Sequence, residues 1–228
     1  MIFETILFCL CMISCADTEK EILPPVSDQP HDYTQLMNKT VEVPVGYNLE
    51  AEHKGDVVRI DYKTRDYAEG TGTVRTNTAY VYLPYGYDGN AERRYNVFYF
   101  VHGHYGTAAS FFQDENGLLR NLLDHMVENG DMSPTIVVSP SYNYGNPTTN
   151  YADADPYCEA LPQELVNDLM PVVESRYRTY SQSTDAAGLE ASREHRAIGG
   201  FSMGAVTTWY ALEHTLDYFK YFMPVSAD

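Results

Sequence analysis

The sequence predicts an α/β fold built on a central, mostly parallel sheet, and two observations carry that prediction. From residue 96 onward, apolar runs typical of strands alternate with segments whose apolar residues recur at helical spacing. Such alternation indicates parallel strands joined by helices that cover both faces of the sheet. In addition, residues 200–204 read Gly-Phe-Ser-Met-Gly and lie between a strand-like and a helix-like segment, which is the setting of a nucleophile elbow.

The first predicted strands form a hairpin-like start to the domain. Residues 57–62 and 78–83 are rich in β-branched and aromatic residues, and Pro84 and a turn at 86–89 end the second run. Residues 96–101 then form an apolar run, which predicts a central strand that is buried on both faces.

The remaining elements follow from the same patterns. A helical stripe covers residues 118–127, and a strand follows at 135–138. Residues 161–173 predict a second helix with a kink at Pro171, because proline cannot donate an intrahelical hydrogen bond. Polar loops are expected at 139–155 and 181–192. The elbow strand is expected at 195–199, the final helix at 205–212 and the final strand at 221–225.

Composition fits one domain and restricts its partners. The chain has 228 residues, with 15 Lys and Arg against 32 Asp and Glu and a net charge of −17. Such an acidic surface repels phosphate backbones and anionic lipids, so we expect no nucleic-acid partner. Neutral ligands such as carbohydrate remain open, and the 20 tyrosines could supply sugar-stacking surfaces as well as core residues.

The N-terminal residues predict export. Residues 1–15 are mostly apolar and end in Met-Ile-Ser-Cys, which resembles a bacterial lipoprotein signal with Cys15 as the lipidated residue. The stretch has no Lys or Arg and carries Met12 where such signals usually have Leu, so a plain signal peptide is the alternative. It is too short to span a bilayer, and a lipid anchor is therefore the one membrane contact we expect. Residues 16–50 are expected to be a tether, which leaves 51–228 as the folded domain.

Cysteine usage agrees with this organisation. Cys9, Cys11 and Cys15 lie in the leader, so Cys158 is alone in the mature chain and no internal disulfide can form there. We expect Cys158 to be an inert packed thiol. The sequence offers no Cys-rich metal site, and neither a metal nor another cofactor is expected.

The elbow predicts Ser202 as a nucleophile, with glycines as the small neighbours that its strained turn requires. Attack on an ester carbonyl needs donors for the developing oxyanion, and the N–H of Met203 is the first candidate. The loop at 102–106, His-Gly-His-Tyr-Gly, follows an earlier central strand and should supply the second. We expect the His104 N–H to fill this role, with the Tyr105 N–H as the alternative.

Aromatic residues near the ends of the strands are the candidates for substrate binding. Tyr142 and Tyr144 belong to the loop after the strand at 135–138, at the carboxyl edge of the sheet where ligands bind in open α/β folds. Together with Tyr105 they could stack on a phenolic or sugar ring. A solvated loop with incidental aromatic residues is the alternative.

Four stretches resemble one known family, the esterase D–type α/β-hydrolases. They are Val-His-Gly at 101–103, the run 168–177, the run 195–204, and Tyr-Leu-Pro at 82–84 followed by Gly-Tyr. Over residues 55–228 the chain is most similar to bacterial feruloyl esterases, which also occur as xylanase-linked domains. The resemblance implies an α/β-hydrolase fold, no metal, and hydrolysis of hydroxycinnamoyl or acetyl esters on plant cell-wall xylan.

The sequence departs from the family in one respect. In the family the catalytic His and acid both follow later strands, whereas this sequence ends at Asp228. None of the seven histidines occupies the family's place for the base, and Asp228 falls too early to be a good acid candidate. We therefore expect a C-terminally incomplete hydrolase domain, with the His and acid beyond Asp228. A non-catalytic carbohydrate-binding protein on a degenerate hydrolase scaffold, or an esterase for another ester such as a siderophore, are the alternatives.

Overall fold

The computed structural model describes residues 42–89, 91–113, 117–146 and 150–226. Within them, four strands lie in the part where a parallel sheet is predicted: β3 (Asn96–Val101), β4 (Thr135–Ser139), β5 (Arg196–Phe201) and β6 (Tyr221–Val225). They pair in parallel in the order β4-β3-β5-β6. All six residues of β3 are buried, as the apolar run predicts. Cys15, the leader and Asp228 lie outside the described residues.

An antiparallel hairpin extends this sheet at one edge. β1 (Asp56–Arg65) pairs with β2 (Val74–Leu83), and β2 then pairs antiparallel with β4. The complete order is β1-β2-β4-β3-β5-β6. The predicted hairpin-like start and mostly parallel sheet are therefore both confirmed.

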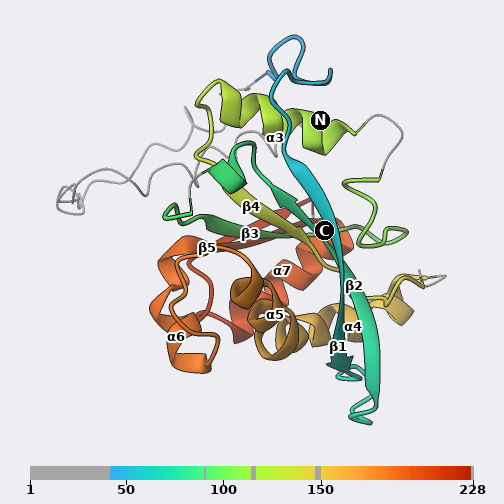
Figure 1. The fold of residues 1–228 in the computed structure, drawn as a ribbon. Helices are drawn as coiled ribbons and strands as arrows, with labels where there is room; N and C mark the ends of the chain where they lie inside the picture. The colour runs from blue at the N-terminus through green and yellow to red at the C-terminus, as the bar shows by residue number, and fades with distance from the viewer. Residues whose placement is uncertain (1–41, 90, 114–116, 147–149, 227–228) are drawn as a thin grey trace, which may run out of the picture.

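Helices cover both faces of the sheet (Figure 1). α3 (Leu118–Glu128) packs on one face, and its apolar side chains meet those of Phe98 and Phe100. The opposite face carries the larger apolar cluster, to which the longer helices contribute. Its elements are α4 (Tyr151–Glu164), the π turn η3 (Leu165–Leu169), α5 (Met170–Arg176), α6 (Ala186–Ala191) and α7 (Met203–His214), with short 3-10 turns at η2 (Tyr87–Gly89) and η4 (Arg193–His195).

The helix predicted at 161–173 differs from the observed one. Helical structure begins at Tyr151, inside the segment expected to be a loop, because the Asn150 side chain caps the helix by accepting from the Asp153 N–H at 2.9 Å. Pro171 lies in the first turn of α5, directly after the π turn, at a position where a missing N–H is tolerated. The irregularity lies instead at the π turn. The short α6 likewise replaces part of the predicted loop 181–192, with Asp185 as its cap.

The predicted tether boundary at residue 50 is also wrong. Tyr47 is buried against α3, and Asn129 donates to its hydroxyl at 3.0 Å. The Asn48 carbonyl accepts from Asn121 at 3.1 Å. Residues 43–49 are therefore part of the packed domain, although the burial of one tyrosine leaves no periodic signal in the sequence.

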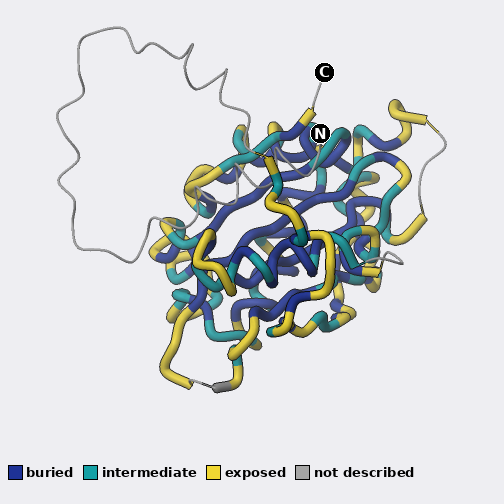
Figure 2. The backbone as a smooth tube through the Cα atoms, turned by 90° about the horizontal axis from the view of Figure 1, so that it is seen from above, coloured by how far each residue is buried: buried dark blue, intermediate teal, exposed yellow. Residues whose placement is uncertain are grey.

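Burial decreases outward from the strands, as Figure 2 shows from above. Cys158 lies in the buried part of α4, and burial raises the pKa of its thiol to about 12. It is therefore a packed, protonated thiol at neutral pH, as predicted.

Among the described residues no helix has the length and apolar character needed to cross a membrane.

Candidate active site

Ser202 occupies a strained turn between β5 and α7. Its backbone has φ 55° and ψ −117°, a left-handed conformation that non-glycine residues rarely adopt and that costs about 1–3 kcal/mol. The Ser202 N–H donates to the Val225 carbonyl of β6 at 3.0 Å, and its own carbonyl accepts from the Ala205 N–H at 2.7 Å. These bonds hold the serine at the N-terminus of a twelve-residue helix, whose dipole favours negative charge there.

Close packing explains the two glycines of the elbow. A Cβ on Gly200 would lie 2.4 Å from the Gly204 carbonyl oxygen, and a Cβ on Gly204 would lie 2.1 Å from the Val101 carbonyl oxygen. Neither distance is compatible with a side chain. The Gly-x-Ser-x-Gly pattern is thus required for α7 to start directly against the end of β3.

The loop at 102–106 lies beside the serine. β3 and β5 are neighbouring parallel strands, with Val101 paired to Gly200, so both chains leave the sheet at the same edge. A Cβ on Gly103 would lie 3.5 Å from the Ser202 Cβ. The structure therefore brings together the two segments in which sequence analysis places the nucleophile and the second oxyanion donor.

The N–H groups of Met203 and His104, the predicted oxyanion donors, belong to the two segments that meet at Ser202. Met203 is the first residue of α7, and the first N–H groups of a helix have no intrahelical acceptor. Within the described residues, neither the Met203 N–H nor the His104 N–H donates to a carbonyl outside its own element. The assignment of these two groups as oxyanion donors remains a prediction, and their availability is consistent with it.

His102 shapes this loop and is not available as a base. It is 1% exposed, and burial lowers its pKa to about 4, so the ring is neutral at physiological pH. Nδ1 lies 2.8 Å from the Gly103 carbonyl oxygen, which can only accept a proton, so Nδ1 carries the hydrogen. Nε2 lies 2.9 Å from the Ser141 Oγ.

The loop after β4 holds the loop at 102–106 through side-chain hydrogen bonds to its carbonyl groups. The Tyr142 hydroxyl donates to the carbonyls of Gly103, at 3.1 Å, and His104, at 3.3 Å. The Asn143 Nδ2 donates to the Gly106 carbonyl at 3.0 Å. Tyr142 is only 1% exposed and so offers no ring face for stacking. Its predicted role in substrate stacking is wrong for this conformation, and it positions the neighbouring loop instead.

The other two tyrosines remain accessible. Tyr105 is 74% exposed, and its ring packs edge-on against the buried His104 imidazole, with 4.4 Å between ring centroids. Tyr144 is half-buried, and the Arg75 guanidinium lies 5.3 Å from its ring centroid. It lines a cavity of about 230 Å³ between β2 and the loop after β3. Both keep their predicted roles as candidate substrate contacts.

The described residues do not complete a triad. No hydrogen bond within them joins the Ser202 hydroxyl to a histidine or a carboxylate. His195 lies at the opposite end of β5, where its Nδ1 contacts the Asn96 side chain at 2.9 Å. A catalytic His and acid located beyond Asp228 therefore remain a prediction.

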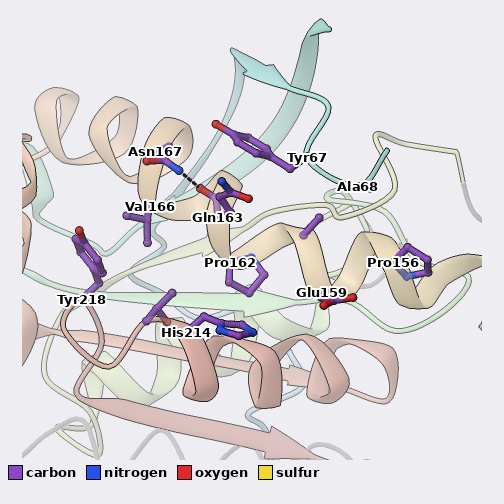
Figure 3. Close-up of a pocket in the computed structure, with 12 residues that line it drawn as sticks. Tyr67, Ala68, Pro156, Glu159, Pro162, Gln163, Val166, Asn167, His214 and Tyr218 are labelled. Atoms are coloured by element: carbon purple, nitrogen blue, oxygen red, sulfur yellow. Dashed lines mark hydrogen bonds between the residues drawn. The ribbon is translucent and has the colours of Figure 1, made fainter. Parts of the chain in front are cut away.

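A larger cavity, of about 590 Å³, lies away from Ser202, between α4, η3 and the C-terminal end of α7 (Figure 3). Tyr67 lies above it and His214 below it in that view, with Tyr218 and Glu159 at its two sides. Ser202 lies at the opposite end of α7 from His214. An active site assigned by cavity size alone would therefore lie at the wrong end of α7 from Ser202.

Comparisons with known proteins agree with this geometry. The family described as "Putative esterase" matches residues 71–227. Endo-1,4-beta-xylanase Y of Acetivibrio thermocellus is 45% identical over 158 residues, which cover 69% of this chain. An endo-1,4-beta-xylanase/feruloyl esterase of Xylanibacter ruminicola is 28% identical over 166 residues, or 71% of this chain.

Solved structures show the same fold. A mutant feruloyl esterase module from Clostridium thermocellum, complexed with sinapinate, has a TM-score of 0.69 and 39% identity, and the match covers 81% of this chain. A ferulic acid esterase from Anaeromyces mucronatus, with a TM-score of 0.60 and 23% identity over 78% of this chain, shares the fold. This chain spans 58% of the first of these structures and 62% of the second. It spans 14% and 20% of the two curated xylanases, so the match does not assign the activities of those whole proteins to this chain.

Proposed function

Because the chain belongs to the esterase family and has the α/β-hydrolase fold that its sequence predicts, we propose that it is a serine carboxylic-ester hydrolase. One observation carries the proposal most strongly. Ser202 stands in a left-handed turn at the N-terminus of α7, directly against the loop at 102–106. A strained serine beside both the first turn of a helix and a glycine-containing loop is suited to acyl transfer, because each segment could supply a backbone N–H to the oxyanion.

The reaction follows from this arrangement. The Ser202 Oγ attacks the ester carbonyl carbon while a general base takes its proton, and the carbonyl oxygen gains negative charge. The Met203 and His104 N–H groups donate to that oxygen. The tetrahedral intermediate then expels the alcohol, which takes up the proton, and water hydrolyses the acyl-enzyme by the same steps. The base is a histidine held by an acid, both of which we place beyond Asp228.

Feruloyl or acetyl esters of plant cell-wall xylan are the proposed substrates. Support comes from relatives named as xylanases and feruloyl esterases and from a similar module that binds sinapinate, a hydroxycinnamate. The accessible tyrosines, Tyr105 and Tyr144, could contact a phenolic or sugar ring. Because such a polymer is extracellular, the apolar leader supports an exported enzyme, with Cys15 as the candidate site of a lipid anchor.

Hydrolysis of methyl ferulate and p-nitrophenyl acetate by the purified protein tests this proposal. We expect turnover of both esters and a fall in kcat of about 10⁶-fold in Ser202→Ala, the size of effect that removal of a serine nucleophile has. Ser175→Ala, which alters an exposed serine on α5, is the matched control and should keep its activity. Equal activity of Ser202→Ala and the unaltered protein would refute the proposal.

A second candidate function, binding of neutral carbohydrate, is favoured by the cavity in Figure 3. Its lining combines the aromatic rings of Tyr67 and Tyr218 with the amides of Gln163 and Asn167, and it includes no Lys or Arg. Aromatic faces and amides suit a polyhydroxylated, uncharged ligand, and the volume is within the range of small-ligand sites. Titration of xylo-oligosaccharides into Ser202→Ala, with Tyr218→Ala as comparison, tests it. Heats of binding that vanish in Tyr218→Ala would support the candidate, and their absence in both proteins would remove it.

A further inference from the structure

Glu164 is a buried carboxyl group that the proposed reaction leaves without a role. It is 2% exposed and stands at the last residue of α4, immediately before the π turn η3. Its side chain faces the β1–β2 hairpin, away from solvent. A buried carboxyl is expensive unless it is well hydrogen-bonded, so its partners indicate why it is kept.

Those partners come from two strands. The Tyr62 hydroxyl of β1 donates to the Glu164 Oε1 at 2.5 Å, and the Asn77 Nδ2 of β2 donates to the same oxygen at 2.8 Å. The Asn77 amide has a second N–H, which donates to the Ser141 carbonyl at 2.8 Å. Glu164 thereby fixes the orientation of an amide that in turn holds the loop after β4.

The chain of contacts continues to the nucleophile's neighbourhood. The Ser141 hydroxyl contacts both the His102 Nε2, at 2.9 Å, and the Asn143 Oδ1, at 2.7 Å. His102 and Asn143 contact the carbonyls of Gly103 and Gly106 respectively. The bonded series Glu164–Asn77–Ser141–His102 therefore ends on the loop that carries the His104 N–H.

The groups around Glu164 determine its charge. Tyr62 and Tyr144 face it from β1 and the loop after β4, and Asp168 faces it from the π turn. Asp168 is itself held by the Thr64 hydroxyl at 2.8 Å and the Tyr67 hydroxyl at 2.9 Å. Farther out, Asp66 is paired with Arg75, and Arg65 lies near Tyr67. No cation contacts Glu164 directly among the described residues, and burial raises its pKa to about 7.

We propose that Glu164 is a positioning residue for ester hydrolysis, whose carboxylate holds Asn77 and, through Ser141 and His102, the loop that presents the second oxyanion donor. The inference rests on the proposed function. Both donors meet the same oxygen, Oε1, and hydrogen bonds to an ionised carboxylate are roughly twice as strong as those to a neutral acid, so both bonds are strongest when Glu164 is ionised. Protonation of Glu164 weakens both bonds, and with them the hold of Asn77 on the loop after β4.

Two measurements test the proposal. The first is amide hydrogen exchange of the peptide containing residues 102–106, from pH 5.5 to 8.5 and corrected for the intrinsic exchange rate. We expect protection against local opening of this loop to increase as pH rises through about 7, although the global unfolding free energy decreases over the same range. The second is the pH profile of kcat and KM for Glu164→Gln. We expect kcat to fall about tenfold at pH 8 with KM within about twofold, since the donor is displaced rather than removed.

Glu213→Gln, an exposed glutamate on α7, is the matched control and should leave both readouts unchanged. Protection of residues 102–106 that is independent of pH in the unaltered protein, or an unchanged kcat in Glu164→Gln, would overturn the proposal. The exchange experiment needs no ester. If the protein hydrolyses no ester, the proposed function fails, while a pH-dependent protection of the loop that is lost in Glu164→Gln would still show the coupling to Glu164.

Discussion

At the scale of single residues, contact distances explain why glycine occupies positions around Ser202. Gly204 has an ordinary backbone conformation, but the first turn of α7 lies so close to β3 that only hydrogen fits. Gly103 faces the same region with more room, because its nearest neighbour atom would be 3.3 Å from a Cβ. The two positions therefore differ in tolerance although both lie at the candidate site.

Gly204→Ala should consequently destabilise the fold. Its methyl group would overlap the Val101 carbonyl oxygen and push α7 away from β3, and overpacking of this kind costs about 1–3 kcal/mol. Urea denaturation followed by circular dichroism measures the effect. Gly103→Ala is the comparison and should lose less than about 1 kcal/mol. An equal loss in the two variants would contradict the contact argument.

Glu164 should make stability depend on pH in a defined direction. Its pKa is about 7 in the folded protein and 4.5 in its unperturbed state, so the folded protein holds a proton that the unfolded chain has lost between these values. The unfolding free energy therefore decreases as pH rises from about 4.5 to 7, by about 3 kcal/mol at most. Glu164→Gln removes this dependence, so its stability relative to the unaltered protein should increase with pH. Thermal melts at pH 5 and pH 8 test this, and a constant difference would refute it.

At the scale of elements, one buried ion pair connects β5 to α5. The Arg196 guanidinium donates to both oxygens of the Glu174 carboxylate, at 2.7 Å and 2.9 Å, and both side chains are 1% exposed. Arg196 also donates to the Leu189 carbonyl at 2.9 Å. The pair thus fixes α5 and the segment around α6 against the start of the strand that carries the elbow.

Breaking this pair should be severe. Glu174→Ala leaves the Arg196 guanidinium buried without its carboxylate, which typically costs about 3–5 kcal/mol. Chemical denaturation should show this loss. Replacement of both residues, Arg196→Met with Glu174→Leu, should recover much of it, because no unpaired charge remains. A double variant that is no more stable than Glu174→Ala would contradict this reasoning.

The elements that the sequence predicts well are those whose pattern repeats. β3, α3 and the β5–Ser202–α7 unit have continuous apolar runs or stripes, and the structure confirms all three. The first turns of α4 escape prediction because Pro156 and three acidic residues obscure any apolar face there, while the Asn150 cap and packing on α7 hold the helix. Tertiary contact decides the outcome where the local pattern is weak.

The candidate site is predictable to the same extent. Ser202 and the loop at 102–106 carry local motifs, and the structure places them side by side. The supporting residues carry no local motif, because Glu164, Asn77 and Ser141 are far apart in sequence and only the fold brings them together. The burial of Tyr142 cannot be foreseen for the same reason, since its loop reads as polar and exposed.

At the scale of the whole molecule, the net charge of −17 should discriminate among substrates. Uncharged feruloylated oligosaccharides have no long-range interaction with this field, so their KM should vary by less than about twofold between 50 and 500 mM salt. Oligosaccharides that also carry uronic acids are repelled, and their KM should fall as salt screens the repulsion. Initial-rate measurements with the two substrate types test this, and an equal salt response would contradict it.

The central claim is that Ser202 is the nucleophile, and covalent labelling tests it most directly. The protein is incubated with a fluorophosphonate probe and digested, and the labelled peptides are mapped by mass spectrometry. We predict one labelled site, on the peptide containing Ser202, and no label in Ser202→Ala of unchanged circular dichroism. Labelling of another serine, or equal labelling of Ser202→Ala, would contradict the account.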